Sequence, residues 1–373
     1  MAAKIRVGLL FGGRSGEHQV SLVSAQGVMA AIDKEKYEVI PIGITPEGRW
    51  LTSGDVLQAL QAGTPDEAQV AALLADPSQH GLLRLQDTDP GVMHVRRTAI
   101  DVILPILHGP FGEDGTVQGL LELAGVPYAG AGVAASALGM DKVLFKDICQ
   151  AHGLPIVPYR SYKRKAWEQD PEGVAQAAEE ALGYPCFVKP ANLGSSVGIS
   201  KAQTREELQV ALHEAARYDR KLLVEQAIDA REIEVSVLGN DDPLVSVPGE
   251  VVPSNEFYDY AAKYLDGTSE LLIPAPLSAE QTAQVQALAR QVYLAIDCAG
   301  MARVDMLLCR DTGTLYLNEV NTIPGFTPIS MYPKLWEASG ISCTELIDRL
   351  IQLALERYQD KSRSETSYMP QFG

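Results

Sequence analysis

Four polar side chains on two neighbouring predicted strands offer the clearest chemistry in this sequence. The residues on either side of a turn centred on Thr312 alternate between apolar and polar, so a hairpin would set Asp305 opposite Glu319. It would also set Arg303, which keeps its charge and can hold an oxyanion, opposite Asn321. Facing carboxylates about 5 Å apart repel each other, and Mg²⁺, which binds carboxylate, amide and phosphate oxygens, removes that repulsion. We therefore predict a magnesium site at Asp305, Glu319 and Asn321, with a solvated hairpin face in another register as the alternative.

A glycine-rich segment that follows a short apolar strand is the second candidate. Lys189 ends the strand, and Gly194 follows a few residues later. The next two residues, Ser195 and Ser196, add hydroxyl groups. Glycines let backbone N–H groups approach an anion closely, and the hydroxyls and the lysine add donors and positive charge. We predict that this segment binds phosphate, and a mobile hairpin tip is the alternative.

Three common nucleotide-binding signatures are missing from the sequence. No Gly-Lys dipeptide occurs, which excludes a phosphate loop of the GxxxxGK[ST] type. The first turn, residues 12–16, does not fit GxGxxG, and protein-kinase signatures are missing too. A nucleotide would have to be bound in another way.

Several other residues are weaker candidates. Glu17 and His108 each follow a predicted strand, where α/β folds place ligands, although exposed turns have the same pattern. The same argument applies to residues 113–115. Lys142 begins a predicted helix and by itself is typical of a surface lysine. The aromatic-rich residues 257–264 form either a lid or a loop packed by its own side chains.

Alternating strands and helices position the candidates in the first part of the chain. Short apolar runs that end at turn residues predict buried parallel strands, and they indicate an α/β layer over residues 1–140. Residues 53–98 contain helix or loop without clear strand signals. The predicted elements are strands at residues 5–11, 39–44 and 101–107 and a helix at residues 21–32.

The pattern changes after residue 140, and a chain of 373 residues is too long for one hydrophobic core. We expect a central domain at residues 141–226, a C-terminal domain at residues 227–358 and a disordered tail at residues 359–373. Capping boxes at Thr204 and Ser278 begin two of the helices. The predicted strands are residues 186–189, 222–226, 232–238, 301–307 and 315–321, and the helices are residues 174–182, 278–295, 344–358 and a segment beginning at residue 204.

The net charge, the cysteine spacing and the length of the apolar segments limit the binding partners and the cellular compartment that the sequence allows. The net charge of −17 argues against binding to nucleic acid or to an anionic membrane surface, since both need basic patches. The five cysteines form neither a CxxC pair nor a zinc-binding spacing, which fits a reducing compartment. No segment approaches the roughly 20 apolar residues of a membrane helix. We expect a cytoplasmic protein.

Seven segments, taken in order, resemble the D-alanine–D-alanine ligases of the ATP-grasp superfamily. The resemblance runs from residue 5 to about residue 357. It implies an α/β (α+β ATP-grasp) architecture, with an N-terminal parallel α/β domain and two further domains that hold ATP between two β-sheets. The segments are residues 11–22 (FGGRSGEHQVSL), 108–115 (HGPFGEDG), 140–142 (MDK), 188–198 (VKPANLGSSVG), 257–264 (FYDYAAKY), 300–305 (GMARVD) and 318–327 (NEVNTIPGFT).

The resemblance also implies a nucleotide site. Lys142 and Lys189 would contact the phosphates, the loop at residues 194–198 would close over them, and Lys263 would approach the γ-phosphate. The family often has a lysine where Gln226 stands, so the adenine contact there departs from the pattern. The implied nucleotide-binding residues are Lys142, Phe187, Lys189, Gly194, Ser195, Ser196, Glu225, Gln226, Ile228, Glu232, Phe257, Lys263, Asn318 and Glu319.

The implied reaction joins two D-alanines for peptidoglycan precursor synthesis. ATP phosphorylates the carboxylate of the first, and the amine of the second attacks the acyl phosphate. Asp305, Glu319 and Asn321 would hold two Mg²⁺ ions, with Glu319 bridging and Mn²⁺ as an alternative metal. Homodimers are common in the family, so we expect one here.

The remaining implied roles concern the amino acids. The proton acceptor stays open between His108 and Tyr264. Tyr264 favours an amine nucleophile, but D-serine or D-lactate as second substrate is the nearest alternative. A non-catalytic nucleotide sensor is a more distant one, against which the intact hairpin set speaks. The implied roles are Glu17 for the first ammonium, Ser330 and Met331 for the second carboxylate, Arg303 and the Gly325 N–H for the oxyanion, and Glu17, Ser195 and Tyr264 for the hydrogen bonds that shut the lid.

Overall fold

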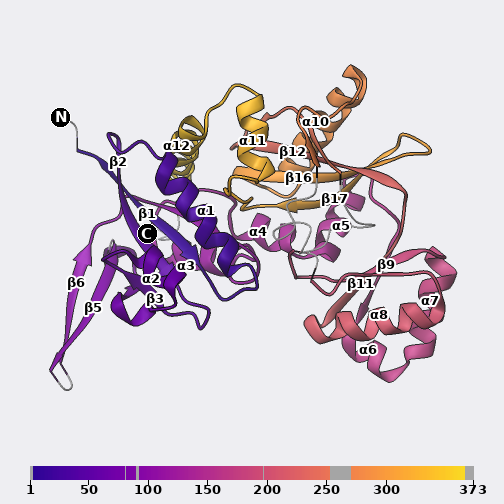
Figure 1. Cartoon of the computed structure of the whole chain (residues 1–373), viewed down its shortest axis with the longest axis horizontal. Coiled ribbons are helices and arrows are strands. Elements are labelled where there is room, and N and C mark those ends of the chain that lie inside the picture. The colour runs from indigo at the N-terminus through magenta and orange to yellow at the C-terminus, as the bar shows by residue number, and fades with distance from the viewer. Residues whose placement is uncertain (1–2, 80, 90–91, 196, 253–269, 366–373) are drawn as a thin grey trace, which may run out of the picture.

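A computed structural model describes residues 3–79, 81–89, 92–195, 197–252 and 270–365 of the chain. The described strands form three sheets, each covered by helices (Figure 1). The strands of each sheet fall within one of the three predicted domain ranges. The α/β fold class is confirmed, and the domain boundaries themselves stay a prediction.

The first sheet carries three parallel strands, as predicted, at one end of the order β6-β5-β4-β3-β2-β1-β7. Their side chains are buried on both faces, because α1 and α12 cover one face and α3 covers the other. The turns that follow β1 and β7 therefore lie at one edge of the sheet. These elements are β1 (Ile5–Gly12), α1 (His18–Ala31), β2 (Tyr37–Ile44), β7 (Val102–Leu107) and α3 (Thr116–Ala124).

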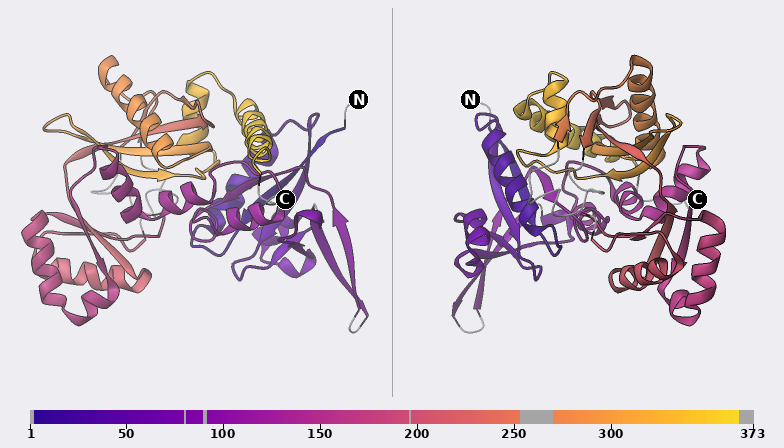
Figure 2. Two further views of the ribbon diagram at one scale, coloured as in Figure 1. Left: turned by 180° about the vertical axis from the view of Figure 1, so that it is seen from behind. Right: turned by 45° about the vertical axis from the view of Figure 1, so that its right-hand side comes forward.

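The prediction of helix or loop without strands for residues 53–98 was wrong. Three antiparallel strands lie there and a fourth lies just before them; together they extend the sheet, so it is mixed rather than wholly parallel. The β5–β6 hairpin projects away from the body of the molecule (Figures 1 and 2), and the β6 side chains Met93 and Val95 are exposed. Strands held mainly by backbone pairing carry little hydrophobic alternation, so their sequence signal is weak. β3 (Trp50–Thr52) precedes the segment, which contains α2 (Val56–Ala62), β4 (Gln69–Leu73), β5 (Leu82–Asp89) and β6 (Val92–Thr98).

The second sheet, in the order β10-β9-β11-β8, is antiparallel. Cys186, Val188, Leu222 and Val224 point to one face and pack against α7 and α8. The residues between them in sequence point to the other face, because side chains alternate along a strand. The elements are α4 (Val133–Met140), α5 (Lys142–Ala151), β8 (Tyr159–Lys163), α6 (Arg164–Gln169), α7 (Pro171–Leu182), β9 (Cys186–Pro190), β10 (Ser200–Ala202), α8 (Arg205–Tyr218) and β11 (Lys221–Gln226).

The third sheet is also antiparallel, with the main order β15-β14-β12-β16-β17. Alternate residues of β12 and β16, among them Val235 and Val304, pack against α10 and α5. The capping box predicted at Ser278 is present at the start of α10. The elements are β12 (Ala230–Gly239), β13 (Leu244–Val245), β14 (Gly249–Val252), β15 (Glu270–Leu272), α10 (Ala279–Ala295), β16 (Gly300–Cys309), β17 (Leu315–Asn321), α11 (Met331–Ala338) and α12 (Cys343–Lys361).

Helix α12 ties the C-terminal part of the chain to the first sheet. Leu346 and Leu350 pack in one cluster with Val7 and Leu104. The helix continues to Lys361, three residues beyond its predicted end, so residues 359–361 are helical and not part of a disordered tail. No helix in the described ranges is long and apolar enough to cross a lipid bilayer.

Candidate active site

Two adjoining cavities lie where the three sheets meet. The larger, of about 650 Å³, lies between the second and third sheets, and the smaller, of about 410 Å³, lies between the third sheet and the turns after β1 and β7. They share a wall formed by Lys142, Leu193, Gly194, Ser195 and Glu319. The two cavities therefore adjoin at these five residues.

The larger cavity collects the nucleotide-binding residues that the resemblance implied. They come from α5, from β9 and the loop after it, from β11 and the turn that follows it, and from β12 and β17. Alternation along β9 and β11 turns Phe187, Lys189 and Glu225 away from the helix-packed face of the second sheet. Ser196, Phe257 and Lys263 lie outside the described residues. The other predicted residues all line the cavity: Lys142, Phe187, Lys189, Gly194, Ser195, Glu225, Gln226, Ile228, Glu232, Asn318 and Glu319.

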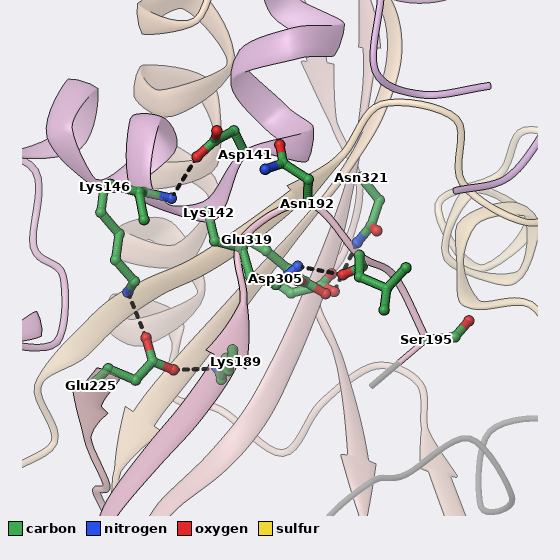
Figure 3. Close-up of polar contacts among 12 residues, drawn as sticks. Asp141, Lys142, Lys146, Lys189, Asn192, Ser195, Glu225, Asp305, Glu319 and Asn321 are labelled. Atoms are coloured by element: carbon green, nitrogen blue, oxygen red, sulfur yellow. Dashed lines mark hydrogen bonds and ion pairs between the residues drawn. The ribbon is translucent and has the colours of Figure 1, made fainter. Parts of the chain in front are cut away.

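Glu225 is the centre of a buried charge cluster in the larger cavity (Figure 3). Its Oε1 pairs with Lys189, and its Oε2 lies 3.0 Å from the Nζ of Lys146. Burial alone would raise the pKa of Glu225, but the two lysines more than offset it and lower the pKa to about 2. The sequence analysis missed Lys146. Its spacing of four residues from Lys142 on one helix was the available signal.

The predicted hairpin register is confirmed at the site. Asp305 lies opposite Glu319, and Arg303 lies opposite Asn321. Closer to the turn, Met306 pairs with Leu317, so Asn318 is the extra residue of a β-bulge. The bulge turns both Asn318 and Glu319 toward the larger cavity.

Arg303 and Lys142 balance the negative charges on the hairpin in this structure. The Nε and Nη2 atoms of Arg303 each donate to Asp305 over 2.7 Å, and its Nε lies 3.0 Å from Glu234. Lys142 Nζ lies 3.5 Å from Glu319 Oε2. The inference that the facing carboxylates need a divalent cation is therefore too strong. Glu234 was missed, although it alternates with Glu232 along a predicted strand.

The smaller cavity brings Glu17 and Ser195 together from distant parts of the chain. The Ser195 hydroxyl donates to Glu17 Oε1, which is one of the implied lid contacts. A Cβ on Gly194 or on Gly109 would lie 2.7 or 2.6 Å from Glu17 Oε2, so a side chain at either position would displace the Glu17 carboxylate, and Gly109 also has a φ of +74°, which favours glycine. Tyr264 lies outside the described residues. The predicted residues that line this cavity are Glu17, His108, Lys142, Gly194, Ser195, Arg303, Glu319, Asn321, Gly325, Ser330 and Met331.

Asp305 belongs to the predicted metal set but is largely covered. Its side chain is 13% exposed, and Arg303 and the Asn321 amide nitrogen, at 3.0 Å, both donate to it. In the described part of the chain, no group of three or more Asp, Glu, His or Cys side chains is arranged for a metal ion. The metal prediction therefore rests on two carboxylates and one amide.

Two family models match the chain. The "D-ala D-ala ligase N-terminus" model matches residues 6–131, and the "D-ala D-ala ligase C-terminus" model matches residues 148–352. The chain belongs to the D-alanine–D-alanine ligase family. Members of this family are ATP-dependent ligases with the ATP-grasp fold, as the resemblance implied.

Relatives of known name and structure span nearly the whole chain. A D-alanine–D-alanine ligase of Natranaerobius thermophilus is 50% identical over 98% of this chain and 99% of its own length, and one of Thermoanaerobacter pseudethanolicus is 54% identical over 96% and 99%. The D-alanine-D-alanine ligase structure from Coxiella burnetii has a TM-score of 0.83 at 36% identity and covers 97% of both chains. The VanG D-Ala:D-Ser ligase structure from Enterococcus faecalis has a TM-score of 0.83 at 35% identity and covers 94% and 100%.

Both ring nitrogens of His108 have hydrogen-bond partners, so His108 is not a free proton acceptor. Its Nδ1 lies 3.0 Å from the Ile323 carbonyl oxygen, so Nδ1 carries the proton. Its Nε2 lies 3.2 Å from the Ser24 hydroxyl, which in turn accepts the N–H of Phe326. Burial lowers the pKa of His108. The neutral ring thus ties β7 to the loop that contains Gly325.

Glu113 links the same loop to the turn after β7. Its carboxylate accepts the N–H of Gly109 over 2.6 Å and the N–H of Ile323 over 3.3 Å, and it lines the smaller cavity. Burial, together with the charge of Glu17, raises the pKa of Glu113 to about 8. Its position after a buried strand was noted from the sequence, but no role was assigned to it.

Proposed function

We propose that this chain joins two D-alanines to form D-alanyl-D-alanine, with ATP converted to ADP and phosphate, for peptidoglycan precursor synthesis. The observation that carries the proposal is the wall shared by the two cavities, which contains Lys142, Ser195 and Glu319. ATP in the larger cavity would present its γ-phosphate at this wall, and the carboxylate of D-alanine in the smaller cavity would approach from the other side. The names of the relatives support the same substrates.

In this proposal the larger cavity binds ATP along its length. Of the residues that line the cavity, Glu225, Gln226, Ile228 and Glu232 would contact adenine and ribose with Phe187, and Lys142 and Lys189 would contact the phosphates. Gly194, Ser195 and Ser196 close over the phosphates, and Phe257 and Lys263 complete the site from outside the described residues. Positioning and electrostatic stabilisation supply most of the catalysis in phosphoryl transfer.

The three predicted metal ligands have donors that suit Mg²⁺, although only Glu319 lies in the shared wall; Asn321 lines the smaller cavity, and Asp305 is in the lining of neither cavity. Asp305, Glu319 and Asn321 present hard oxygen ligands on adjacent strands, and Glu319 faces both cavities. The proposal places two Mg²⁺ ions on these residues, with Glu319 bridging and Mn²⁺ as an alternative metal. When bound, the ions would neutralise charge on the transferring phosphoryl group.

The reaction has two steps. A carboxylate oxygen of the first D-alanine attacks the γ-phosphorus, and ADP leaves. The amine nitrogen of the second D-alanine then attacks the acyl carbon, and the tetrahedral oxyanion collapses as the C–O bond to phosphate breaks. Arg303 and the Gly325 N–H would hold this oxyanion. Because the attacking nitrogen must lose a proton, an acceptor is needed, and the hydrogen bonds of His108 with Ser24 and Ile323 favour Tyr264 over His108 for that role.

The two substrates would be held by their charged ends. The Glu17 carboxylate would bind the first ammonium group between the glycines that surround it. Ser330 precedes α11, and Met331 is the first residue of that helix. Backbone N–H groups at a helix N-terminus suit an anion, so the second carboxylate would bind there.

Phosphate release tests the proposal. With ATP and Mg²⁺, we expect release in the presence of D-alanine and none above background with L-alanine or without an amino acid. Release that does not depend on D-alanine would contradict the proposal, and a complete absence of release with D-alanine would favour a protein that only binds nucleotide. Analysis of the product by mass spectrometry with D-alanine, D-serine and D-lactate in competition then decides the second substrate, and we expect the D-alanine dipeptide to dominate.

The proposal also places the enzyme in the cytoplasm, where ATP is supplied, as a homodimer. Multi-angle light scattering of the purified chain tests the oligomeric state. A mass near 80 kDa is expected because one chain has a mass of 40.3 kDa. A mass of one chain at micromolar concentration would contradict the dimer.

A further inference from the structure

Lys146 is a buried lysine to which the proposed reaction assigns no task. It lies on α5, one turn after Lys142, and its side chain is 1% exposed. A buried ammonium group is costly unless it is paired, so its retention in the interior calls for a compensating partner. The partner is Glu225 Oε2, at 3.0 Å.

Glu225 is the ion-pair partner of Lys146, and the Lys146 Nζ also lies 5.8 Å from the centre of the Tyr159 ring. Apart from this ion pair, neither the Nζ of Lys146 nor the Oε2 of Glu225 has a hydrogen-bond partner in the described part of the chain. Lys146 also lies outside the walls of both cavities, whereas Glu225 and Lys189 line the larger one. The most direct route from Lys146 to a ligand in the larger cavity is therefore the Glu225 carboxylate.

The charges of Lys146, Glu225 and Lys189 show how Lys146 would affect phosphate binding. Glu225 lies between Lys146 and Lys189, so one carboxylate is shared by two cations (Figure 3). Without Lys146, Glu225 would be neutralised by Lys189 alone, and the charge of Lys189 would be less available to phosphate. With Lys146 in place, the cluster keeps one net positive charge beside the cavity.

The two lysines also keep Glu225 ionised and hold its carboxylate in place. An ionised carboxylate only accepts hydrogen bonds, and two lysines on its two oxygens restrict its rotation. Adenine offers an exocyclic amino group as donor, whereas guanine has a carbonyl acceptor at the equivalent position. A carboxylate held in the ionised form therefore favours adenine and repels guanine.

We propose that Lys146 is a positioning residue for the nucleotide, which acts through Glu225 to favour ATP over GTP and leaves Lys189 free to bind phosphate. This inference rests on the proposed function, since it takes ATP as the occupant of the larger cavity. It adds a determinant of nucleotide selectivity that lies behind the cavity wall.

The test compares Lys146→Met with Glu225→Gln and with the double variant K146M/E225Q. For K146M we expect a KM for ATP raised at least tenfold, a ratio of kcat/KM for ATP over GTP lowered at least tenfold, and an unchanged KM for D-alanine. The double variant should be no worse than E225Q, because Lys146 acts through Glu225. Lys165→Met, an exposed lysine on α6, is the matched control and should match the wild type.

Three outcomes would overturn the inference. The first is a K146M enzyme that loses active fraction and thermal stability while it keeps its KM for ATP and its ATP:GTP ratio, since that is a purely structural role. The second is a double variant whose KM for ATP exceeds that of E225Q tenfold. The third outcome is a K146M enzyme whose KM for D-alanine rises as much as its KM for ATP. If K146M does not fold, the KM values for ATP of E225Q and the double variant still test whether Lys146 acts through Glu225. Failure of the wild type to release phosphate with D-alanine would instead count against the proposed function.

Discussion

Asp305 faces Glu319 across the β16–β17 hairpin only because Asn318 is bulged out of β17. Nearer the turn, Met306 lies opposite Leu317. If that register continued along the strands, Asp305 would face Asn318 instead. The bulge thus brings the two carboxylates level and turns Asn318 toward the larger cavity as well. A bulge beside a functional site is a common means of redirecting side chains.

Replacement of Asp305 tests the metal assignment. We expect Asp305→Asn to lower kcat/KM at least about 100-fold, because the neutral amide removes a charged ligand for Mg²⁺. Steady-state phosphate release at varied Mg²⁺ measures the effect. Asp311→Asn, in the exposed turn of the same hairpin, is the control and should keep wild-type activity. Wild-type turnover by D305N would refute the metal assignment.

Gly194 tests the space around Glu17. We expect Gly194→Ala to raise the KM for D-alanine about tenfold or more, because the new methyl group would lie 2.7 Å from Glu17 Oε2 and displace the carboxylate. Initial rates at saturating ATP measure it. Gly119→Ala on α3, where a Cβ meets nothing within 4 Å, is the matched control and should stabilise the helix by about 0.5–1 kcal/mol without a change in KM. Equal KM values for both variants would argue against the role of Glu17.

Sequence reasoning succeeded where the pattern along single strands determined the outcome. Alternation in residues 301–307 and 315–321, with a turn centred on Thr312, correctly predicted that Asp305 faces Glu319, but not the bulge at Asn318 that produces this pairing. It failed where tertiary contacts decided. The spacing of Lys142 and Lys146 places both lysines on one face of a helix, but only the fold shows that β11 brings Glu225 to the Nζ of Lys146. Likewise, β6 carries too few buried side chains to produce a strand signal.

Ser24 tests the connection between α1 and the oxyanion loop. We expect Ser24→Ala to lower kcat about tenfold with little change in the KM for ATP, because it frees His108 Nε2 and the Phe326 N–H beside Gly325. Ser246→Ala is a matched control, since this buried serine also accepts a backbone N–H, that of Ser236, and lies outside both cavity walls. Both variants should lose about 1–3 kcal/mol of stability. A comparable loss of kcat in both would contradict a specific role for Ser24.

The raised pKa of Glu113 predicts that the stability of the protein depends on pH. The pKa of Glu113 is raised in the folded state from an ordinary value near 4.5 to about 8. The stability of the folded protein that depends on a neutral Glu113 is therefore fully present below pH 4.5 and is lost as the pH rises through 8. We expect the Tm of the wild type to fall over this window relative to that of Glu113→Gln, which stays neutral. Thermal unfolding from pH 4.5 to 8.5 measures this. Exposed Glu280→Gln should keep the wild-type slope. Parallel curves for wild type and E113Q would contradict the shifted pKa.

The path of a carboxylate oxygen is the most direct test of the central claim, that a carboxylate in one cavity attacks a phosphate in the other. The experiment uses D-alanine labelled with ¹⁸O in both carboxylate positions, together with ATP and Mg²⁺, and analyses the released phosphate by mass spectrometry. We expect one ¹⁸O atom in each phosphate, because the acyl phosphate breaks at its C–O bond. Phosphate without label, released at the same rate as dipeptide, would show that no carboxylate oxygen attacks the γ-phosphorus.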